Sequence, residues 1–165
     1  MKDIAYKRVL LKLSGEALAG ERKNGVDAET LGKICDEIKK MVDLGVEVAI
    51  VVGGGNFWRG RTSETIDRNK ADQIGMLATV MNCIYVSEIF RSVGMKTEIF
   101  TPFACGAMTK LFSKDEANAC FAEKKVAFFA GGTGHPYFST DTTAALRAAE
   151  INADAILMAK NGVDG

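Results

Sequence analysis

Glycines gather at three places in this sequence where a ligand could be bound. They stand at residue 15, at residues 53–55 and at residues 131, 132 and 134, and each place lies at the end of a short apolar run. Glycine adopts positive φ without strain and lets main-chain N–H groups approach a ligand closely, and successive N–H groups in such a turn form a concave anion site. A tight strand-to-helix turn would explain one cluster on steric grounds, but three clusters at strand ends indicate a phosphate-handling site.

The two common nucleotide-binding motifs are both absent from the sequence. A Walker loop requires G-x-x-x-x-G-K-[ST], which no stretch matches. The dinucleotide fingerprint G-x-G-x-x-G would need glycine at two positions that are Trp58 and Tyr137 here. The phosphates must therefore be held in another way.

Charged residues near the glycine clusters suggest how the phosphates are held. Lys12 interrupts an apolar strand just before its turn, so it either reaches solvent at a strand edge or directs a cation into the site. Arg59 and Arg61 follow the triple glycine, where a guanidinium either grips phosphate oxygens or lies in a solvated loop. Asp141, at a predicted helix start, either caps that helix or orients the lysine. Asp72, in the first turn of another predicted helix, either complements the helix dipole or contacts a ligand.

Nucleophilic and metal chemistry find little support. His135 is the only histidine and precedes Pro136 in a glycine turn with no evident carboxylate or cysteine partner, so we interpret it as a loop residue. The four cysteines form no C-x-x-C pair, which leaves a zinc site almost without ligands. We assign no residue as a metal ligand. Three cysteines fall within helical patterns and fit small buried apolar residues, and scattered cysteines of this kind favour a reducing cytoplasm.

The elements that position these residues alternate between strand and helix. Apolar runs predict strands at residues 9–13, 46–52, 96–100, 126–130 and 154–159. Periodicity and capping residues predict helices at 27–44, 70–93, 113–124 and 140–152. This alternation predicts an α/β fold, a three-layer αβα sandwich with a mainly parallel sheet, in which ligands bind beyond the carboxyl ends of the strands.

The long predicted helix at residues 70–93 is apolar on two sides. One face holds Ile74, Leu77, Met81, Ile84 and Tyr85, and the other holds Met76, Val80, Cys83, Val86 and Phe90. A helix with two apolar faces must be buried on both. It is therefore either a central core helix or a helix that packs on the sheet with one face and on a second subunit with the other.

Length and composition limit the class of protein. The chain has 165 residues, of which 47% are hydrophobic and 25% charged, as expected for one soluble globular domain over residues 1–165. Its 21 basic and 21 acidic residues balance, which argues against a broad basic surface for nucleic acid or anionic membrane. No apolar run approaches the roughly 18 residues that span a bilayer, and no signal-peptide core precedes the first strand.

Four stretches together resemble a known family. Residues 12–18, Lys-Leu-Ser-Gly-Glu-Ala-Leu, and residues 53–60, with Gly-Gly-Gly-Asn at 53–56 and Arg-Gly at 59–60, resemble the amino acid kinase superfamily. Residues 71–79 (A-D-Q-I-G-M-L-A-T) and 133–141 (T-G-H-P-Y-F-S-T-D) are similar to the bacterial uridylate kinases. Carbamate and acetylglutamate kinases would share the first two stretches only. They remain the alternative enzymes, and a non-catalytic nucleotide-binding regulatory module remains the alternative outside enzymes.

The resemblance implies an activity and a role for each matching residue. The activity is transfer of the γ-phosphoryl group of ATP to UMP, giving UDP and ADP in pyrimidine nucleotide biosynthesis, with Mg2+ as cofactor. The implied catalytic residues are Lys12, Arg59 and Asp141. The implied ATP-binding residues are Lys12, Leu13, Ser14, Gly15, Gly55, Arg59 and Asn161. The implied UMP-binding residues are Gly54, Asp72, Thr133, Gly134, His135, Pro136, Tyr137, Phe138, Ser139 and Thr140.

The resemblance also implies an assembly and regulation. Members of the family form homohexamers built from dimers, are activated by GTP and are inhibited by UTP. The implied GTP region here comprises Gly20, Glu21, Arg22, Lys23, Asn24 and Gly25, where many relatives carry a Gly-Phe-Gly type stretch, so activation by GTP is left open. Family members continue for roughly another half of this length. We therefore expect these residues to form nearly all of the UMP side but only the phosphate end of the ATP side, and to bind ATP poorly alone.

Overall fold

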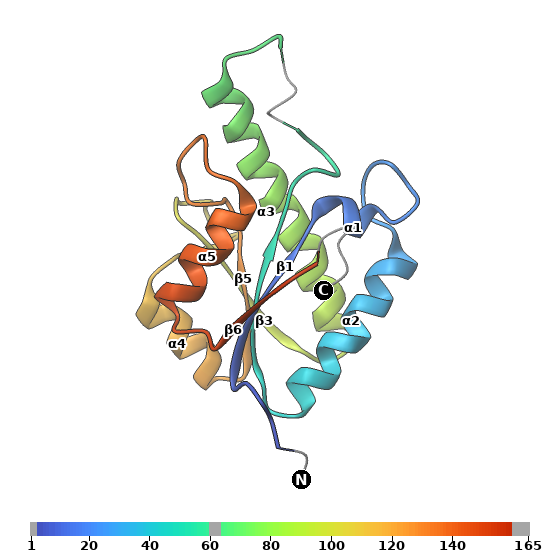
Figure 1. Ribbon diagram of the computed structural model, residues 1–165, viewed down its shortest axis with the longest axis vertical. Helices are drawn as coiled ribbons and strands as arrows, with labels where there is room; N and C mark the ends of the chain where they lie inside the picture. Colours follow the sequence, from blue (N-terminus) through green and yellow to red (C-terminus); the bar gives the residue numbers. More distant parts are fainter. Residues whose placement is uncertain (1–2, 60–63, 160–165) are drawn as a thin grey trace.

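One six-stranded sheet organises the molecule (Figure 1). The structure is a computed structural model that describes residues 3–59 and 64–159. The strand order is β4-β3-β5-β2-β1-β6, and every pairing is parallel. The strands are β1 (Arg8–Leu13), β2 (Glu47–Val52), β3 (Lys96–Thr101), β4 (Lys110–Leu111), β5 (Lys125–Phe129) and β6 (Ala155–Met158). The predicted α/β fold and its five predicted strands are confirmed.

Helices cover both faces of this sheet. The helices are α1 (Gly15–Ala19), α2 (Ala28–Asp43), α3 (Arg68–Ser92), α4 (Lys114–Ala122) and α5 (Thr140–Glu150). Successive side chains of a strand point to opposite faces, and β2 shows the result. Val48, Ile50 and Val52 pack with α2 and α3, whereas Ala49 and Val51 pack with α4 and α5. Two apolar cores on either side of one sheet make the predicted three-layer sandwich.

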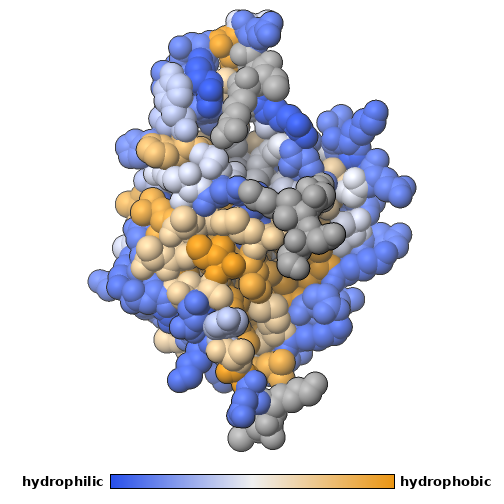
Figure 2. Space-filling view, viewed as in Figure 1, coloured by the Kyte–Doolittle hydropathy of each residue, from blue (hydrophilic) through white to orange (hydrophobic). Residues whose placement is uncertain are grey.

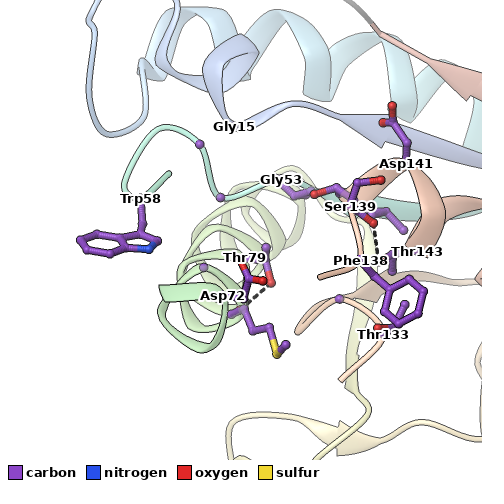
Figure 3. Close-up of a pocket in the computed structure, with 18 of the residues that line it drawn as sticks. Gly15, Gly53, Trp58, Asp72, Thr79, Thr133, Phe138, Ser139, Asp141 and Thr143 are labelled. Atoms are coloured by element: carbon purple, nitrogen blue, oxygen red, sulfur yellow. Dashed lines mark hydrogen bonds between the residues drawn. The ribbon is translucent and has the colours of Figure 1, made fainter. Parts of the chain in front are cut away.

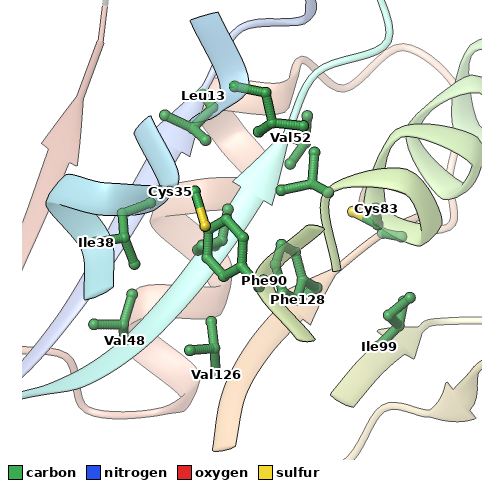
Figure 4. Packing of buried hydrophobic residues seen from close by; sticks show 14 of the residues in the cluster. Leu13, Cys35, Ile38, Val48, Val52, Cys83, Phe90, Ile99, Val126 and Phe128 are labelled. Atoms are coloured by element: carbon green, nitrogen blue, oxygen red, sulfur yellow. The ribbon is translucent and has the colours of Figure 1, made fainter. Parts of the chain in front are cut away.

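The core between the sheet and helices α2 and α3 is shown in Figure 4. Cys35 and Ile38 of α2 and Cys83 and Phe90 of α3 are buried in it. The Phe90 ring meets the Phe128 ring of β5 edge to face, with centroids 5.4 Å apart, a geometry that aromatic pairs prefer. This packing fixes α3 against the sheet and so fixes the residues that α3 carries toward the strand ends.

Polar side chains start the helices where the sequence places them. The Asp27 carboxylate accepts the Thr30 N–H at the start of α2, and the Ser113 hydroxyl accepts the Glu116 N–H at the start of α4. These caps satisfy N–H groups that have no partner within the helix. The predicted starts of both helices are therefore confirmed.

Two short elements were not predicted. Helix α1 has five residues and is capped by Ser14, whose hydroxyl accepts the Ala17 N–H. Strand β4 has two exposed residues paired to the end of β3. Neither segment is long enough to show a hydrophobic period, so pattern analysis does not detect it.

Helix α3 is buried on one side only. Val80, Cys83, Val86 and Phe90 pack onto the sheet as expected. The opposite face holds large apolar side chains that are 39–54% exposed, and we call these residues the outer stripe: Ile74, Leu77, Met81, Ile84 and Tyr85. The interpretation of α3 as a central core helix is therefore wrong for this face, and packing on a second subunit stays a prediction.

Among the described residues, α3 is the one helix whose length and composition would allow it to cross a membrane. In the fold, 44% of its most apolar window is buried inside the molecule. The core helix of a soluble protein has the same properties, so this finding is weak evidence for membrane insertion.

The strand β6 lies at one edge of the sheet. Its Ile156, Leu157 and Met158 are 37–43% exposed, and Figure 2 shows an apolar area in the middle of the corresponding face. Its start is tied to β1 by the Asp154 carboxylate, which accepts the N–H groups of Lys7 and Arg8 at 2.8 and 2.9 Å.

Candidate active site

A pocket of about 430 Å³ lies beyond the carboxyl ends of β1, β2 and β5 (Figure 3). Its wall includes members of all three glycine clusters, namely Ser14, Gly15, Gly53, Gly54, Gly55, Gly132 and Thr133. The predicted convergence of the clusters at one edge of the sheet is therefore confirmed. A pocket of this size suits a small-molecule ligand.

An ion pair between a buried lysine and a half-buried aspartate lines the pocket. Lys12 is only 9% exposed, and its strand β1 lies between β2 and β6 rather than at an edge of the sheet. Its Nζ is 3.0 Å from Oδ1 of Asp141 in the first turn of α5. The alternative of a lysine that reaches solvent at a strand edge is thus wrong.

The helix start beside this pair is capped by a different residue. The Ser139 hydroxyl accepts the Thr142 N–H and begins α5. Capping is therefore not what holds Asp141 in place, and its carboxylate is directed at Lys12. The N-terminus of α5 and the lysine together make this part of the pocket favourable for anions.

The first two glycine clusters are in close contact with each other. A Cβ on Gly15 would lie 2.5 Å from Oδ1 of Asn56, and one on Gly55 would lie 2.5 Å from Oε1 of Glu16. Both distances are shorter than real Cβ contacts allow. Close approach therefore requires glycine at position 15, where a Cβ would also lie 2.7 and 2.9 Å from the backbone nitrogens of Gly55 and Asn56, whereas at position 55 the nearest atoms belong to the flexible Glu16 side chain.

The third cluster needs glycine for its backbone. Gly131, Gly132 and Gly134 have φ of 79°, 62° and 84°, values that residues with a Cβ rarely adopt. The Gly131 N–H donates to the buried Thr79 hydroxyl at 2.8 Å, which itself donates to the Met76 carbonyl. Thr79 of helix α3 therefore fixes the position of this loop.

A pair of asparagines holds the second cluster. The side-chain amides of Asn56 and Asn82 donate to each other at 2.9 and 2.7 Å, and Asn82 also donates to the Gly53 carbonyl at 2.7 Å. The Asn56 amide donates to the Gly25 carbonyl at 2.8 Å. This network connects the glycine loop to the predicted effector region at residues 20–25, whose first five residues are exposed and do not line the pocket.

Several predicted ATP-binding residues lie away from the pocket wall. The Arg59 side chain is 60% exposed, and its Nη2 lies 2.8 Å from Oε1 of Glu16, which does line the pocket. Leu13 is a core residue whose carbonyl accepts the Gly53 N–H. Arg61 and Asn161 are outside the described residues.

The predicted UMP-binding loop borders the other half of the pocket. Thr133, His135, Phe138, Ser139 and Thr140 line it, as do Gly54 and Asp72, whereas Gly134, Pro136 and Tyr137 belong to the loop without lining the pocket. Helix α3 begins at Arg68, so Asp72 is in the second turn rather than the predicted first. Its Oδ2 accepts the Tyr137 N–H at 2.8 Å.

Sequence reasoning missed several residues of the pocket wall. Trp58, Arg68, Thr79, Thr143 and Glu16 all line it. The Trp58 indole donates to the Ala71 carbonyl at 2.8 Å, which packs this ring beside the start of α3. One sequence feature could have identified Thr79 as a site residue, because it is a polar residue on the buried face of an apolar helix.

The cysteines take no part in the pocket. Burial raises the pKa of the Cys83 and Cys120 thiols to about 12 and also raises that of Cys35. Cys105 is half-buried and does not line the pocket. A thiolate nucleophile is not available from the three buried thiols at neutral pH.

The pocket thus combines a buried lysine, a helix N-terminus and two glycine loops at one end with a carboxylate and an aromatic loop at the other. Such a site can hold a chain of phosphates and a second, smaller acceptor. The fold and the site define a phosphotransferase of α/β architecture.

The chain belongs to the amino acid kinase family, whose family model matches residues 7–165. Curated relatives agree over the whole chain. A uridylate kinase from Limosilactobacillus reuteri (strain DSM 20016) is 53% identical over 100% of this chain and 70% of its own length. A uridylate kinase from Pediococcus pentosaceus is 49% identical over 100% of this chain and 69% of its own length.

Solved structures of similar proteins agree with the fold. The crystal structure of UMP kinase from Bacillus anthracis superposes with a TM-score of 0.92 at 41% identity, over 97% of this chain and 67% of that one. UMP kinase from Ureaplasma parvum gives a TM-score of 0.91 at 34% identity, over 98% of this chain and 69% of that one. The family resemblance inferred from four sequence stretches is confirmed.

Proposed function

We propose that this chain is a UMP kinase, which transfers the γ-phosphoryl group of ATP to UMP and gives UDP and ADP. The observation that supports this most strongly is the agreement between its relatives, named uridylate kinase, and its pocket. A carbamate or acetylglutamate kinase is not favoured, because the similar curated and solved proteins are UMP kinases.

At the ATP end, the glycine loops would cradle the phosphates. Ser14, Gly15 and Gly55 would offer main-chain N–H groups, and Lys12 would place its ammonium group against the transferred phosphoryl. Asp141 would hold this ammonium group through the 3.0 Å ion pair. Leu13, Arg59 and Asn161 complete the proposed ATP side, and Arg59 would have to exchange Glu16 for a phosphate oxygen.

At the UMP end, Asp72 would accept the ribose hydroxyls and the 133–140 loop would enclose the nucleotide. The residues proposed for this side are Gly54 and the loop residues Thr133, Gly134, His135, Pro136, Tyr137, Phe138, Ser139 and Thr140. The N-terminus of α5 would bind the acceptor phosphate, since its first N–H groups and dipole favour an anion.

The chemistry requires positioning and charge rather than a covalent intermediate. A phosphoryl transfer spreads negative charge over the transferred group and the bridging oxygen. Lys12, held among buried groups, would stabilise that charge, and the glycine loops would align donor and acceptor. His135 is exposed and needs no role as a base in this scheme.

We propose Mg2+ as the cofactor, entering with ATP. Within residues 3–59 and 64–159, no group of three or more His, Cys, Asp or Glu side chains could hold a metal ion. Mg2+ in kinase sites takes most of its ligands from substrate phosphates and water and the rest from one or two carboxylates, so a single carboxylate beside the phosphate-binding loops would be enough. Asp141 is the carboxylate that would contribute, and the bound ion would neutralise phosphate charge.

We further propose that the protein is a cytoplasmic homohexamer assembled from dimers. The exposed outer stripe of α3 supports this, because apolar patches of this kind mark protein contacts. GTP and UTP are the proposed effectors, and residues 20–25 reach the glycine loop through the Asn56 amide. Rate measurements with and without GTP test the activation.

The decisive experiment is an ADP-release assay with ATP and a set of acceptors. UMP is expected to give the highest rate, above CMP, carbamate and small carboxylates. A higher rate with carbamate would assign the chain to another branch of the family. Nucleotide binding without ADP release from any acceptor would favour a regulatory module.

A further inference from the structure

Arg68, the first residue of α3, makes an unusual set of contacts at the edge of the pocket. Its Nε lies 3.0 and 2.9 Å from the two carboxylate oxygens of Asp72. Its guanidinium carbon lies 5.1 Å from the centre of the Tyr137 ring. One side chain therefore contacts both the carboxylate and the loop proposed to hold UMP.

Helix electrostatics do not explain this ion pair. A cation in the first turn opposes the helix dipole. The order of the pair, with the cation four residues before the anion, is also the weaker one for helix stability. The pair is instead explained by the way in which it fixes the orientation of the Asp72 carboxylate.

The carboxylate is nearly saturated by the protein. An ionised carboxylate offers about four lone-pair sites. Oδ2 accepts from Arg68 Nε and from the Tyr137 N–H, and Oδ1 accepts from Arg68 Nε. One site on Oδ1 is left, on a side chain that lines the pocket.

The loop is held by the same contacts. Tyr137 has φ of 72°, a conformation that non-glycine residues rarely adopt. The surrounding structure must therefore hold it there. The hydrogen bond from its N–H to Asp72 and the guanidinium over its ring both contribute to this.

We propose that Arg68 is a positioning residue for the nucleotide acceptor. It fixes the Asp72 carboxylate so that Oδ2 retains the loop and Oδ1 presents one acceptor to a ribose hydroxyl. This inference rests on the proposed UMP kinase function. Beyond that function, we infer that the preference for a nucleotide with both ribose hydroxyls depends on Arg68, although Arg68 does not contact the sugar.

The test measures binding to the full-length protein by isothermal titration calorimetry. Arg68→Gln is compared with the unsubstituted protein for UMP, 2′,3′-dideoxy-UMP and ATP. UMP affinity is expected to fall about tenfold or more, whereas dideoxy-UMP affinity falls at most about threefold and ATP affinity stays within about twofold, because only UMP offers hydroxyls to Asp72. Arg68→Lys, which keeps the charge but lacks the planar fork, is expected to give a smaller loss of UMP affinity.

A matched control exists on the same helix. Arg91 lies in the last turn of α3, 3.9 Å from Glu88 and away from the pocket wall, so Arg91→Gln makes the same chemical change outside the site and should leave UMP affinity unchanged. In an Asp72→Asn background, Arg68→Gln should cause no further loss, since residues that act through one another are not additive.

The outcomes separate the inference from the function on which it rests. Equal losses for UMP and dideoxy-UMP in Arg68→Gln, or additive losses with Asp72→Asn, would overturn the positioning role. Failure of the unsubstituted protein to bind UMP would overturn the proposed function itself. If Arg68→Gln does not fold, Arg68→Lys carries the same comparison.

Discussion

Replacing Lys12 by methionine separates stability from turnover in this protein. Methionine keeps the length of the buried aliphatic stem and removes only the charge, so no cavity forms in β1. The change leaves the Asp141 carboxylate without its ammonium partner at 3.0 Å. Stability and catalysis should both fall, for different reasons and by different amounts.

The stability loss follows from the exposure of the two partners. Removing one member of a fully buried pair costs about 3–5 kcal/mol. The Asp141 side chain is 37% exposed and stands at the N-terminus of α5, so water and the helix dipole offset part of this cost. We expect a loss of about 1–2 kcal/mol, measured by urea unfolding.

The loss of turnover should be larger. A single preorganised group that stabilises developing charge contributes a factor of about 10²–10³ in kcat. UMP affinity should change by less than about twofold, because Lys12 would act on the transferred group rather than on the acceptor. Turnover is measured by ADP release in the full-length protein, and UMP binding by the fluorescence of Trp58, the only tryptophan, which lines the pocket.

A double variant separates the role of the lysine charge in stability from its role in turnover. Adding Asp141→Asn to Lys12→Met removes the negative charge that faced the ammonium group, so stability should recover most of the loss while turnover stays low. Wild-type turnover in Lys12→Met would remove the lysine from the mechanism. A loss of UMP affinity as large as the loss of turnover would show that Lys12 serves binding instead.

Three further predictions follow from other parts of the structure. Thr79→Val removes the acceptor of the buried Gly131 N–H and should cost about 1–3 kcal/mol in urea unfolding, whereas Thr79→Ser should retain most of the stability. Cys105 should be the one thiol that Ellman's reagent modifies rapidly in the native protein, because the other three are buried with raised pKa; rapid modification of a second thiol would contradict this. Two main-chain N–H groups at the start of β1 lower the pKa of Asp154, so its stabilisation is present above its unfolded pKa and is lost as pH falls through the lower folded value. Asp154→Asn should therefore flatten the acid limb of a plot of Tm against pH, and an unchanged limb would refute the assignment.

Much of the fold could be predicted because its signals are long and regular. The apolar runs of β1, β2 and β5 and the glycines that end them identify a parallel sheet and the edge where ligands bind. The 25-residue helix α3 showed its two apolar faces in the sequence. The two-residue β4 and the five-residue α1 were missed because they form through tertiary contacts and contain less than one period of any pattern.

The site was predicted less completely, for a physical reason. Glycines, Lys12 and Asp72 stand out by type and position, whereas Arg68 and Trp58 enter the pocket only through the geometry of α3 and the preceding loop. The partner of Arg59 is also a matter of geometry, since Glu16 lies under the glycine loop of another strand. Sequence spacing does not encode which of two distant loops meet.

The position of β1 in the sheet has a consequence for the order in which the strands pair while the protein is synthesised. Arg8 meets Glu47 of β2 across 39 residues of chain but meets Asp154, just before β6, across 146 residues. At about 5–20 residues per second of synthesis, β1 would pair with β2 early and then wait several seconds with its other edge open. The strand that carries Lys12 is therefore among the first to be synthesised and among the last to have a neighbour on both sides. During this interval a nascent chain of this kind is most exposed to wrong strand pairing.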